Sequence, residues 1–547
     1  MRMGRWNGWI TIVCLCGAFA VGQAQSLAEK AYAAYQRKDF TASGDLYLAA
    51  IRAGDTDLNT FYNGACALAL AGRTDAAFGL LDQLQGRGWA DANQLRNDVD
   101  FKGLHGDARW PALLDRMTNA QSRQERFWNS PALRTPYQPN LSEDEKVAGL
   151  SRLWAEAKYN FAYFDLVPDL DWDRLYVESL PRVRQTKSTL EYYRVLMEIV
   201  ARLKDGHSNV NVPEPLVEEV YARPLIATRL IEDRVLIRRV IDDKLASQGI
   251  VPGVEILAVD GVPVREYAER RVAPYQSAST KQDLAVRMYE YALLAGAAKS
   301  PVELTLRDAG GAVFQRTLPR VPPGERAKLL PPAPPFEFKL LANNIGYVAL
   351  NTFDNEQVVK MFEEAFDRIA ATDALVIDIR NNGGGNSGHG WKILSMLTDK
   401  PFRTSMWRTR QYRPAHRAWG MPEGWHEAPA GERAPDGKRL YAKPAVVLLS
   451  PRTFSAAEDF AVAFDAMGRG RMIGEATGGS TGQPLFFPLP GGGSARVCTK
   501  RDSYPDGRAF VGVGVQPQLP VAQTVADFRA DRDTVLEAAL KELAGKR

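Results

Sequence analysis

The chain has 547 residues, which is too long for one hydrophobic core and predicts two to four domains. Its hydrophobic fraction of 45% and charged fraction of 24% are ordinary for a soluble globular protein. The formal net charge is only +4, and no dense basic stripe occurs in the sequence, so the composition gives no indication of nucleic-acid binding.

Residues 1–24 have the layout of a signal peptide. Arg2 and Arg5 precede an apolar stretch of about fifteen residues, and small residues end at Ala24. Because this stretch is short for a spanning helix, we expect cleavage near Ala24 and a periplasmic or secreted protein, with a retained N-terminal anchor as the alternative. No later segment is apolar and long enough to span a membrane, so we expect no integral membrane protein after cleavage.

The cysteines and histidines show no metal-ligand spacing. Cleavage would leave Cys66 and Cys498, which lie in segments assigned below to different domains, and nothing in the sequence supports a disulfide between them. The five histidines are scattered along the chain: His105, His207, His389, His416 and His426. We therefore expect neither a metal nor another cofactor.

Residues 25–125 have the pattern of an all-helical domain. Two stretches, "AEKAYAAYQRKDFTASGDLYLAAI" and "FYNGACALALAGRTDAAFGLLDQL", place small residues and aromatics at helix-pair spacing. They resemble about two tetratricopeptide repeats, although a generic helical bundle would give a similar pattern. Either domain would serve for packing or for binding a protein partner.

Residues 126–213 are expected to be helical again and to end in a turn. The helical stretches "KVAGLSRLWAEAKYNF" and "LEYYRVLMEIVARL" precede the turn "KDGHSNV". Residues 214–322 then contain the strand patterns "RVLIRRV" and "VELTLRD". Between these strands, residues 246–264 resemble part of a PDZ domain, a fold that binds extended peptides by strand addition.

Residues 323–525 alternate strands and helices after a proline-rich linker. The apolar runs "ALVIDIR" and "AVVLL" are strands of the buried type, and the intervening helical patterns predict a mainly parallel sheet covered by helices. Residues 400–440 interrupt this rhythm and carry Trp407, Trp419, Trp425 and His426, which would suit a lid, a substrate wall or an ordinary packed excursion. Residues 526–547 are expected to form a C-terminal helix.

Two turns of this last domain contain residues suited to catalysis. In "SPRTFSAAEDF", Ser455 follows a strand and precedes helical spacing, and its S-x-x-E pattern with Glu458 is typical of a capping box. A serine in such a turn is also a common nucleophile, because the helix N-terminus offers free N–H groups to an anion. The glycines of "DIRNNGGGNSGHG" permit a similar convergence of N–H groups, although the pattern is neither a phosphate loop nor a dinucleotide fingerprint.

The order of the motifs is more specific than any one of them. "DIRNNGGG", "TFSAAE", "IGEATGG" and "GVGVQPQ" occur in this order, and the chain resembles the tail-specific, or C-terminal processing, serine peptidase family over residues 140–520. Tricorn-type proteases and retinoid-binding-protein repeats share this order. The resemblance implies a multidomain α/β protein with a helical N-terminal region, a PDZ-like β-rich domain and a ClpP/crotonase-like α/β peptidase core.

The resemblance also implies the roles of individual residues. Ser455 would attack the scissile carbonyl. The N–H of Ala456 would form half of the oxyanion hole, and Gly384, with Gly385 as the alternative, would form the other half.

The general base implied by the resemblance is a histidine. Many family members have a lysine 25 residues after the nucleophile, but that position here is Ser480, and no lysine lies between Ser455 and Lys500. The tricorn-like branch has a histidine before the PDZ-like domain, and "DGHS" places His207 there. His389, just beyond the glycine loop, is the rival.

The residue that orients the histidine is left open. Val511 stands where relatives often have an acid, and Gln518 stands where many have aspartate. Glu475 in "GEATGG" is the first candidate, although a role in bonding a loop backbone would suit it equally; the weaker candidates are Asp205, Glu458 and Asp506.

Two functions follow as hypotheses. The first is an exported serine endopeptidase that cleaves polypeptides through a Ser455 acyl-enzyme with His207 as base, while the helical N-terminal domain recruits a partner or blocks premature entry. The second is a non-catalytic protein that binds peptides or apolar ligands on the same scaffold. The combined retention of Ser455, the glycine loop and "DGHS" favours the peptidase.

Overall fold

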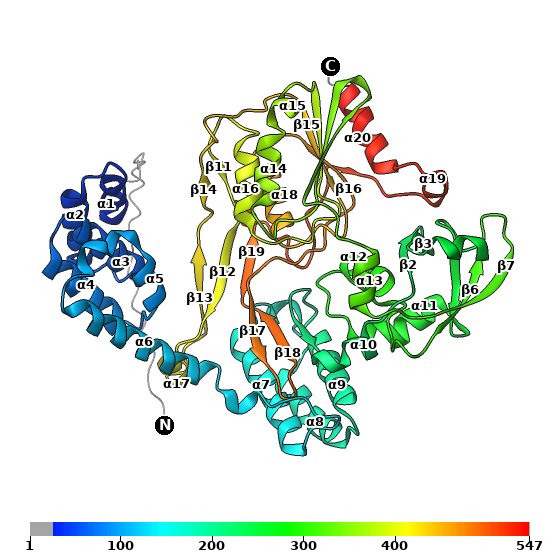
Figure 1. Cartoon of the computed structure of the whole chain (residues 1–547), viewed down its shortest axis with the longest axis horizontal. Coiled ribbons are helices and arrows are strands. Elements are labelled where there is room, and N and C mark those ends of the chain that lie inside the picture. The colour runs from blue at the N-terminus through cyan, green and yellow to red at the C-terminus, as the bar shows by residue number, and fades with distance from the viewer. Residues whose placement is uncertain (1–25, 546–547) are drawn as a thin grey trace, which may run out of the picture. The chain divides into compact units, whose positions relative to one another are not determined.

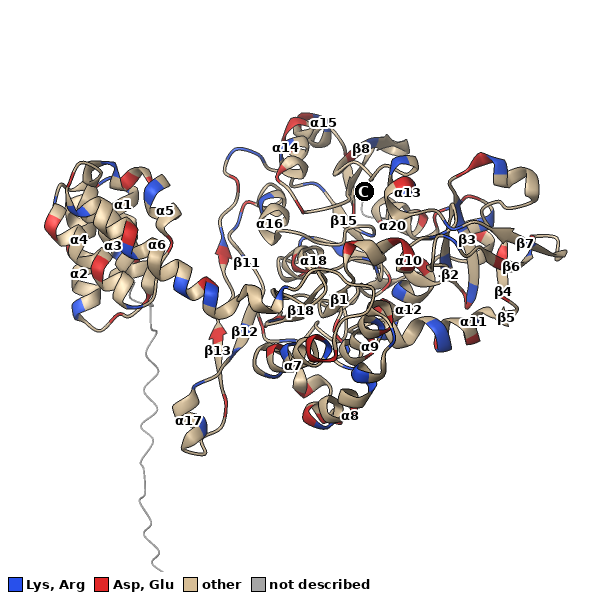
Figure 2. Cartoon of the chain, turned by 60° about the horizontal axis from the view of Figure 1, so that its bottom comes forward, with Lys and Arg blue, Asp and Glu red and all other residues tan. Residues whose placement is uncertain are grey.

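The computed structural model describes residues 26–545, so the predicted signal peptide at residues 1–24 lies outside the described residues. The chain divides into two compact units, one that ends at Ser130 and one that begins at Pro131 (Figure 1). Among the described residues, no helix combines the length and the hydropathy that a membrane span requires. Figure 2 shows basic and acidic residues interspersed along both units.

The first unit is helical, as the sequence predicts. Its α-helices are α1 (Leu27–Gln36), α2 (Phe40–Arg52), α3 (Leu58–Leu70), α4 (Thr74–Gly86), α5 (Ala92–Asn97) and α6 (Arg109–Trp128). Glycines let these helices pack closely, because a Cβ on Gly64 would lie 2.9 Å from the Leu80 side chain. The helix pairs are compatible with tetratricopeptide repeats, and that assignment stays a prediction.

The second unit begins with three helices that lead to the DGHS turn: α7 (Glu143–Asn160), α8 (Trp172–Gln185) and α9 (Thr189–Ala201). The Tyr193 hydroxyl of α9 donates to the carbonyl of Pro490 at 2.6 Å, which fixes α9 to a loop far along the chain. Strand β1 (Asn209–Asn211) then pairs with β18 (Ser494–Cys498). The turn between α9 and β1, which carries His207, is therefore held at both ends.

The β-rich segment that follows is an antiparallel sheet with its own hydrophobic core. Its strands are β2 (Ile226–Ile231), β3 (Arg234–Val240), β4 (Glu255–Val259), β5 (Val262–Pro263), β6 (Val302–Arg307) and β7 (Val313–Leu318). The order β2-β3-β4-β6-β7 leaves β2 at one edge. Helix α12 (Lys281–Val286) continues into a π-helical turn, Arg287–Ala292, that packs against β2. The similarity of residues 246–264 to a PDZ domain stays a prediction.

The core of the second unit is a six-stranded sheet in the order β20-β16-β15-β10-β9-β8, visible at the top of Figure 1. The strands are β8 (Phe336–Leu341), β9 (Ile345–Leu350), β10 (Ala374–Asp378), β15 (Ala445–Leu449), β16 (Arg471–Gly474) and β20 (Leu519–Pro520). All neighbours pair in parallel except β8, which pairs antiparallel to β9 at the edge. The predicted mainly parallel sheet is confirmed.

Alternating side chains bury both faces of this sheet. Leu375 and Ile377 of β10 pack in the large core under α14 (Gln357–Glu364), α16 (Ser387–Ser395) and α18 (Ala456–Ala466). Their neighbours Ala374 and Val376 pack instead with α20 (Thr534–Ala544), the predicted C-terminal helix. Burial on both faces explains why β10 and β15 read as continuous apolar runs.

The excursion at residues 400–440 contains four strands and one short helix. Strand β12 (Met406–Gln411) lies between β13 (Gly424–Ala428) and β19 (Lys500–Ser503), and the short helix α17 (Pro414–Ala418) joins β12 to β13. Three further short strands are β11 (Phe402–Arg403), β14 (Glu432–Arg433) and β17 (Pro484–Pro488). Cys66 and Cys498 are both buried free thiols.

Candidate active site

Ser455 lies at the N-terminus of α18 in a strained backbone conformation. Its φ of 57° and ψ of −126° are rare for a residue with a side chain and cost on the order of 1–3 kcal/mol. Two acceptors hold its N–H, the carbonyl of Ser480 and the Glu458 carboxylate, each at 3.1 Å. Its carbonyl accepts from the N–H of Glu458 at 2.7 Å. Ser455 is thus both the N-cap residue of α18 and a serine whose Oγ faces another partner.

That partner is His207. Its Nε2 lies 3.0 Å from Ser455 Oγ, although the two residues are 248 positions apart. The imidazole stacks on the Phe454 ring, with centroids 4.8 Å apart and planes 21° apart. The structure therefore brings together the predicted nucleophile and the predicted base.

His207 is neutral at ordinary pH. Burial, with Arg496, Arg287 and Lys500 in the surroundings, lowers the pKa of His207 to about 3. Burial is the largest cause, because a cation loses its hydration there, and the three positive side chains add repulsion. A neutral imidazole has one free lone pair, which is what a general base requires.

The second ring nitrogen of His207 contacts Ser480. Its Nδ1 lies 2.7 Å from Ser480 Oγ, and Ser480 Oγ donates to Asp205 Oδ1 at 3.1 Å. Both Ser480 and Asp205 are fully buried. Ser480 occupies the position at which many family members have a lysine, and its sequence context predicted no role for it.

Glu475 lies elsewhere, so the geometry does not support it as the orienting acid. Its carboxylate is 3.9 Å from Arg229 of strand β2 and belongs to a charged group with Arg452 and Glu290. Asp506 pairs with Arg508, and Gln518 bonds Met472 N–H and the Asp465 carboxylate. At His207 Nδ1 the structure places Ser480, with Asp205 behind it.

Glu458 joins the nucleophile to the loop that carries Ser480. Its carboxylate accepts the N–H groups of Ser455, Gly479 and Ser480 at 3.1, 2.7 and 2.9 Å, and the Thr477 hydroxyl at 2.5 Å. Burial raises the pKa of Glu458 to about 7, against the lowering effect of these donors. Glu458 therefore holds the Ser455 backbone against the loop that carries Ser480 and does not orient His207.

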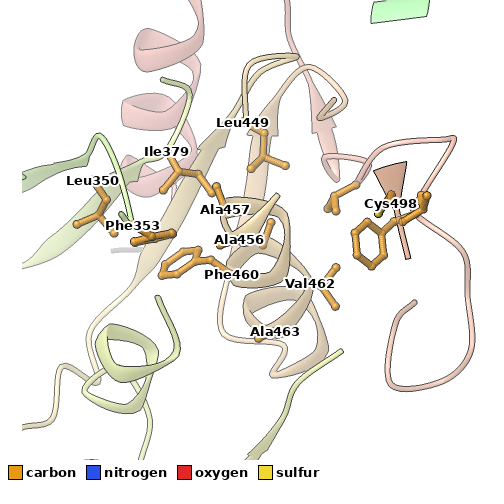
Figure 3. Packing of buried hydrophobic residues seen from close by; sticks show 14 of the residues in the cluster. Leu350, Phe353, Ile379, Leu449, Ala456, Ala457, Phe460, Val462, Ala463 and Cys498 are labelled. Carbon is orange, nitrogen blue, oxygen red and sulfur yellow. The ribbon is translucent and has the colours of Figure 1, made fainter. Parts of the chain in front are cut away.

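The glycine loop lies against Ser455. Gly384 has φ of 104°, and a Cβ there would lie 2.6 Å from Ser455 Cβ and 3.0 Å from the Ala456 nitrogen. Gly385 has φ of 129° and pairs with Phe353, leaving no room for a side chain. Phe353 also packs against Phe460 of α18, with ring centroids 5.8 Å apart, and Figure 3 shows the two rings side by side. This packing fixes the distance between the glycine loop and the nucleophile.

The N–H groups of this loop are not equally available. The Gly384 N–H donates to Asn382 Oδ1 at 2.9 Å. Phe353 bonds the carbonyl of Gly384 and the N–H of Asn386, so the Gly385 N–H points to the other side of the chain. Within residues 26–545, the N–H groups of Gly385 and Ala456 have no acceptor. The alternative donor, Gly385, thus has the more available N–H.

His389 lies on the loop side of the site. Its Nδ1 is 2.9 Å from the carbonyl of Phe353. This contact ties the first turn of α16 to the strand end that pairs with Gly385. Among the described residues, the hydrogen-bond partner of Ser455 Oγ is His207 and not His389.

One cluster of the described residues offers metal-type ligands, outside this site. Ligand atoms of Cys66, Asp98 and Asp100 lie within 4.8 Å of one another. The hydroxyls of Tyr35 and Tyr62 already donate to the two carboxylates, at 2.5 and 2.6 Å. Burial raises the pKa of Cys66, so the thiol keeps its proton. The cluster is accounted for as a partly buried hydrogen-bond network.

Comparison with known proteins identifies this arrangement. Residues 344–521, which hold the glycine loop and Ser455, match the model of peptidase family S41. The C-terminal processing peptidase, chloroplastic, of Tetradesmus obliquus is 29% identical over 243 residues, covering 42% of this chain and 47% of that protein. Residues 344–521 are therefore a peptidase family S41 domain, and the curated proteins that the chain resembles are named C-terminal processing peptidases or proteases.

Further relatives of the family extend the match. The carboxyl-terminal-processing protease of Synechocystis sp. is 25% identical over 303 residues, covering 54% of this chain and 62% of that protein. The chain thus spans about half the length of the curated relatives it matches. The solved structure of mature CPAF complexed with lactacystin has a TM-score of 0.59 at 17% identity and covers 73% of this chain and 98% of that chain, which shows a shared fold.

Proposed function

We propose that the protein is a serine endopeptidase in which Ser455 is the nucleophile and His207 the general base. The observation that carries this proposal is the 3.0 Å contact between Ser455 Oγ and Nε2 of a buried, neutral imidazole. The strained turn and the hydrogen bond from the Ser455 N–H to Glu458 fix the backbone that carries this hydroxyl. A hydroxyl with a basic nitrogen within hydrogen-bond reach is what acyl transfer requires.

In the first step Ser455 Oγ attacks the scissile carbonyl carbon, and its proton passes to His207 Nε2. The N–H groups of Ala456 and Gly385 stabilise the oxyanion, because neither has another acceptor among the described residues. Each such donor contributes on the order of 3 kcal/mol. His207 then protonates the leaving amine and later removes a proton from the water that hydrolyses the acyl-enzyme.

The substrate in this proposal is an extended polypeptide. Strand β2 is the edge of the β-rich sheet, and helix α12 lies in the same module, so a peptide has an edge to extend by strand addition. The PDZ-like residues 246–264 support this role for residues 214–322. We further propose export by the leader at residues 1–24 and partner binding by the helical residues 25–125.

Labelling with a fluorophosphonate probe tests the proposed roles. Wild type is expected to be labelled at Ser455, and His207→Ala is expected to lower the labelling rate by about 10²- to 10⁴-fold, because the proton acceptor is lost. His389→Ala is the matched control, since it removes a second imidazole near the same loop. Equal labelling of wild type and His207→Ala, or loss of labelling in His389→Ala alone, would contradict the assignment of His207.

The pH dependence gives a separate prediction. A lowered pKa means that His207 stays neutral to more acidic pH than the ordinary value of 6.5. Labelling and kcat/KM should therefore persist as pH falls through 6.5. Any decline should begin at least about one pH unit below that value. Rates measured from pH 4 to 8 check this expectation. A decline centred near 6.5 that persists in Glu458→Gln, which removes the carboxyl whose pKa burial raises to about 7, would show a solvated imidazole and would contradict the buried environment described above.

A further inference from the structure

We propose that Ser480 and Asp205 form a relay that positions His207, in place of the acid that relatives carry near the C-terminal glycine motif. This inference rests on the proposed function. The relay runs from His207 Nδ1 to Ser480 Oγ at 2.7 Å and from Ser480 Oγ to Asp205 Oδ1 at 3.1 Å. Together with Ser455 it makes a chain of four side chains. Ser480 and Asp205 are positioning residues, because both act through His207.

The carboxylate sets the direction of the hydrogen bonds. Burial raises the pKa of Asp205, while the hydrogen bonds from Ser208, the His207 N–H and Ser480 and the charge of Arg287 lower it. In its ionised form Asp205 accepts only, so the Ser480 hydroxyl donates to it. Ser480 Oγ is then left to accept a hydrogen bond from His207 Nδ1–H. The proton on Nδ1 leaves the lone pair on Nε2, which faces Ser455. The opposite direction would place the proton on Nε2, where His207 could not act as a base.

Hydrogen bonds hold Asp205 in place and leave its Oδ1 to accept from Ser480. Its Oδ2 accepts from the Ser208 hydroxyl at 2.6 Å. Its backbone is fixed by Ser277, whose Oγ accepts from Asp205 N–H at 3.1 Å and donates to the Asp205 carbonyl at 2.8 Å. Ser279 Oγ accepts the Gly206 N–H at 3.0 Å. The β-rich segment therefore supports the turn that carries both Asp205 and His207.

The charged groups around the relay are accounted for. Arg287 pairs with Asp283 at 2.8 Å and donates to the Gly206 carbonyl at 3.1 Å. Arg496 and Lys500 are the other cations whose charge acts on His207. All three disfavour an imidazolium. The buried Asp205 carboxylate, two hydrogen bonds away from the ring, is the compensating charge that would stabilise the imidazolium while Ser455 is attacking.

Ser480 contacts both the nucleophile and the general base. Its carbonyl accepts the N–H of Ser455 at 3.1 Å, and its own N–H donates to Glu458 at 2.9 Å. The same residue thus holds the backbone of the nucleophile and the ring of the base. During attack the proton of Ser455 moves to Nε2, Nδ1–H keeps its bond to Ser480, and no proton reaches Asp205.

Kinetics of three variants test the relay. Ser480→Ala is expected to lower kcat by about 10- to 100-fold with KM nearly unchanged, because the hydrogen bond acts on the imidazolium. Ser480→Cys fills the same space but is a weak donor and acceptor, so it should behave like alanine. Asp205→Asn should lower kcat by about 10²- to 10⁴-fold, because an amide N–H can reverse the relay. Full activity in Ser480→Cys would show that the residue only fills space and would overturn the proposal.

A spectroscopic measurement keeps the test independent of turnover. In full-length protein labelled with ¹⁵N-histidine, His207→Gln identifies the signals of His207. We expect the proton on Nδ1 in wild type and a shift of the proton toward Nε2 in Asp205→Asn. A wild-type proton on Nε2 would overturn the relay even if the enzyme cleaves peptides. Absence of Ser455-dependent labelling with the expected tautomer would instead overturn the proposed function and leave the relay supported.

Discussion

Replacing Ser455 by alanine is expected to lower polypeptide cleavage by about 10⁴-fold or more, because the attacking atom is removed and only binding and the oxyanion donors remain. The fold should survive. The backbone at this position is already strained with a side chain present, and the Glu458 and Ser480 contacts use the Ser455 backbone rather than Oγ. Turnover of a quenched fluorescent unfolded protein and a thermal melt measure the two effects.

The melt decides how the loss is interpreted. A midpoint within about 2 °C of wild type, with turnover abolished, would assign the chemistry to Oγ. Activity retained in Ser455→Ala, with the same dependence on pH, would place the nucleophile elsewhere and contradict the proposed mechanism. His389→Ala again serves as the control, because its imidazole bonds a backbone carbonyl and not Ser455.

The fold of the core could be predicted because its signal is local. The buried runs of β10 and β15 and the helical spacing after Ser455 are properties of short segments. The two turns that carry chemistry each follow such a strand and precede a helix, so their place at one end of a parallel sheet followed from the topology. The strands of the β-rich segment could be predicted for the same reason.

The residues at His207 Nδ1 were predicted only in part, since Asp205 was named as a weaker candidate and Ser480 had no predicted role. The two residues are 275 positions apart, and neither residue type stands out in a turn rich in small polar residues. The expected partner of the histidine was an acid in direct contact with it, and this expectation favoured Glu475. The structure instead places a hydroxyl between the imidazole and the acid, an arrangement that depends on two distant loops meeting in space, one with Asp205 and His207 and one with Ser480.

The sequence also could not decide whether Gly384 or Gly385 provides the oxyanion-hole N–H, because both glycines satisfy the family pattern. What separates them is the Asn382 side chain, which accepts the N–H of Gly384, and the pairing with Phe353, which turns the Gly385 N–H away from that strand. Such bonds follow from the register of one bridge. Gly384 has a different role, because the absence of a side chain there lets the loop lie directly against Ser455.

Gly384→Ala is therefore expected to lower kcat/KM by at least about 10²-fold, although Gly384 makes no bond to substrate in the proposed mechanism. The added Cβ would lie 2.6 Å from Ser455 Cβ and 2.8 Å from the carbonyl of Phe454, so the nucleophile or the loop must move. A displacement of about 1 Å is enough for a loss of this size. The φ of 104° adds strain on the order of 1–3 kcal/mol, which a denaturant titration should detect.

Gly383→Ala is the matched control for this prediction. A Cβ on Gly383 would meet no atom within 4 Å, and its φ lies outside the range that alanine avoids. Its activity and stability should stay within about twofold and 1 kcal/mol of wild type. Similar losses in both variants would show that the loop requires flexibility rather than close approach. A loss confined to Gly384→Ala would show that the oxyanion loop and the nucleophile are held at a contact distance that only glycine permits.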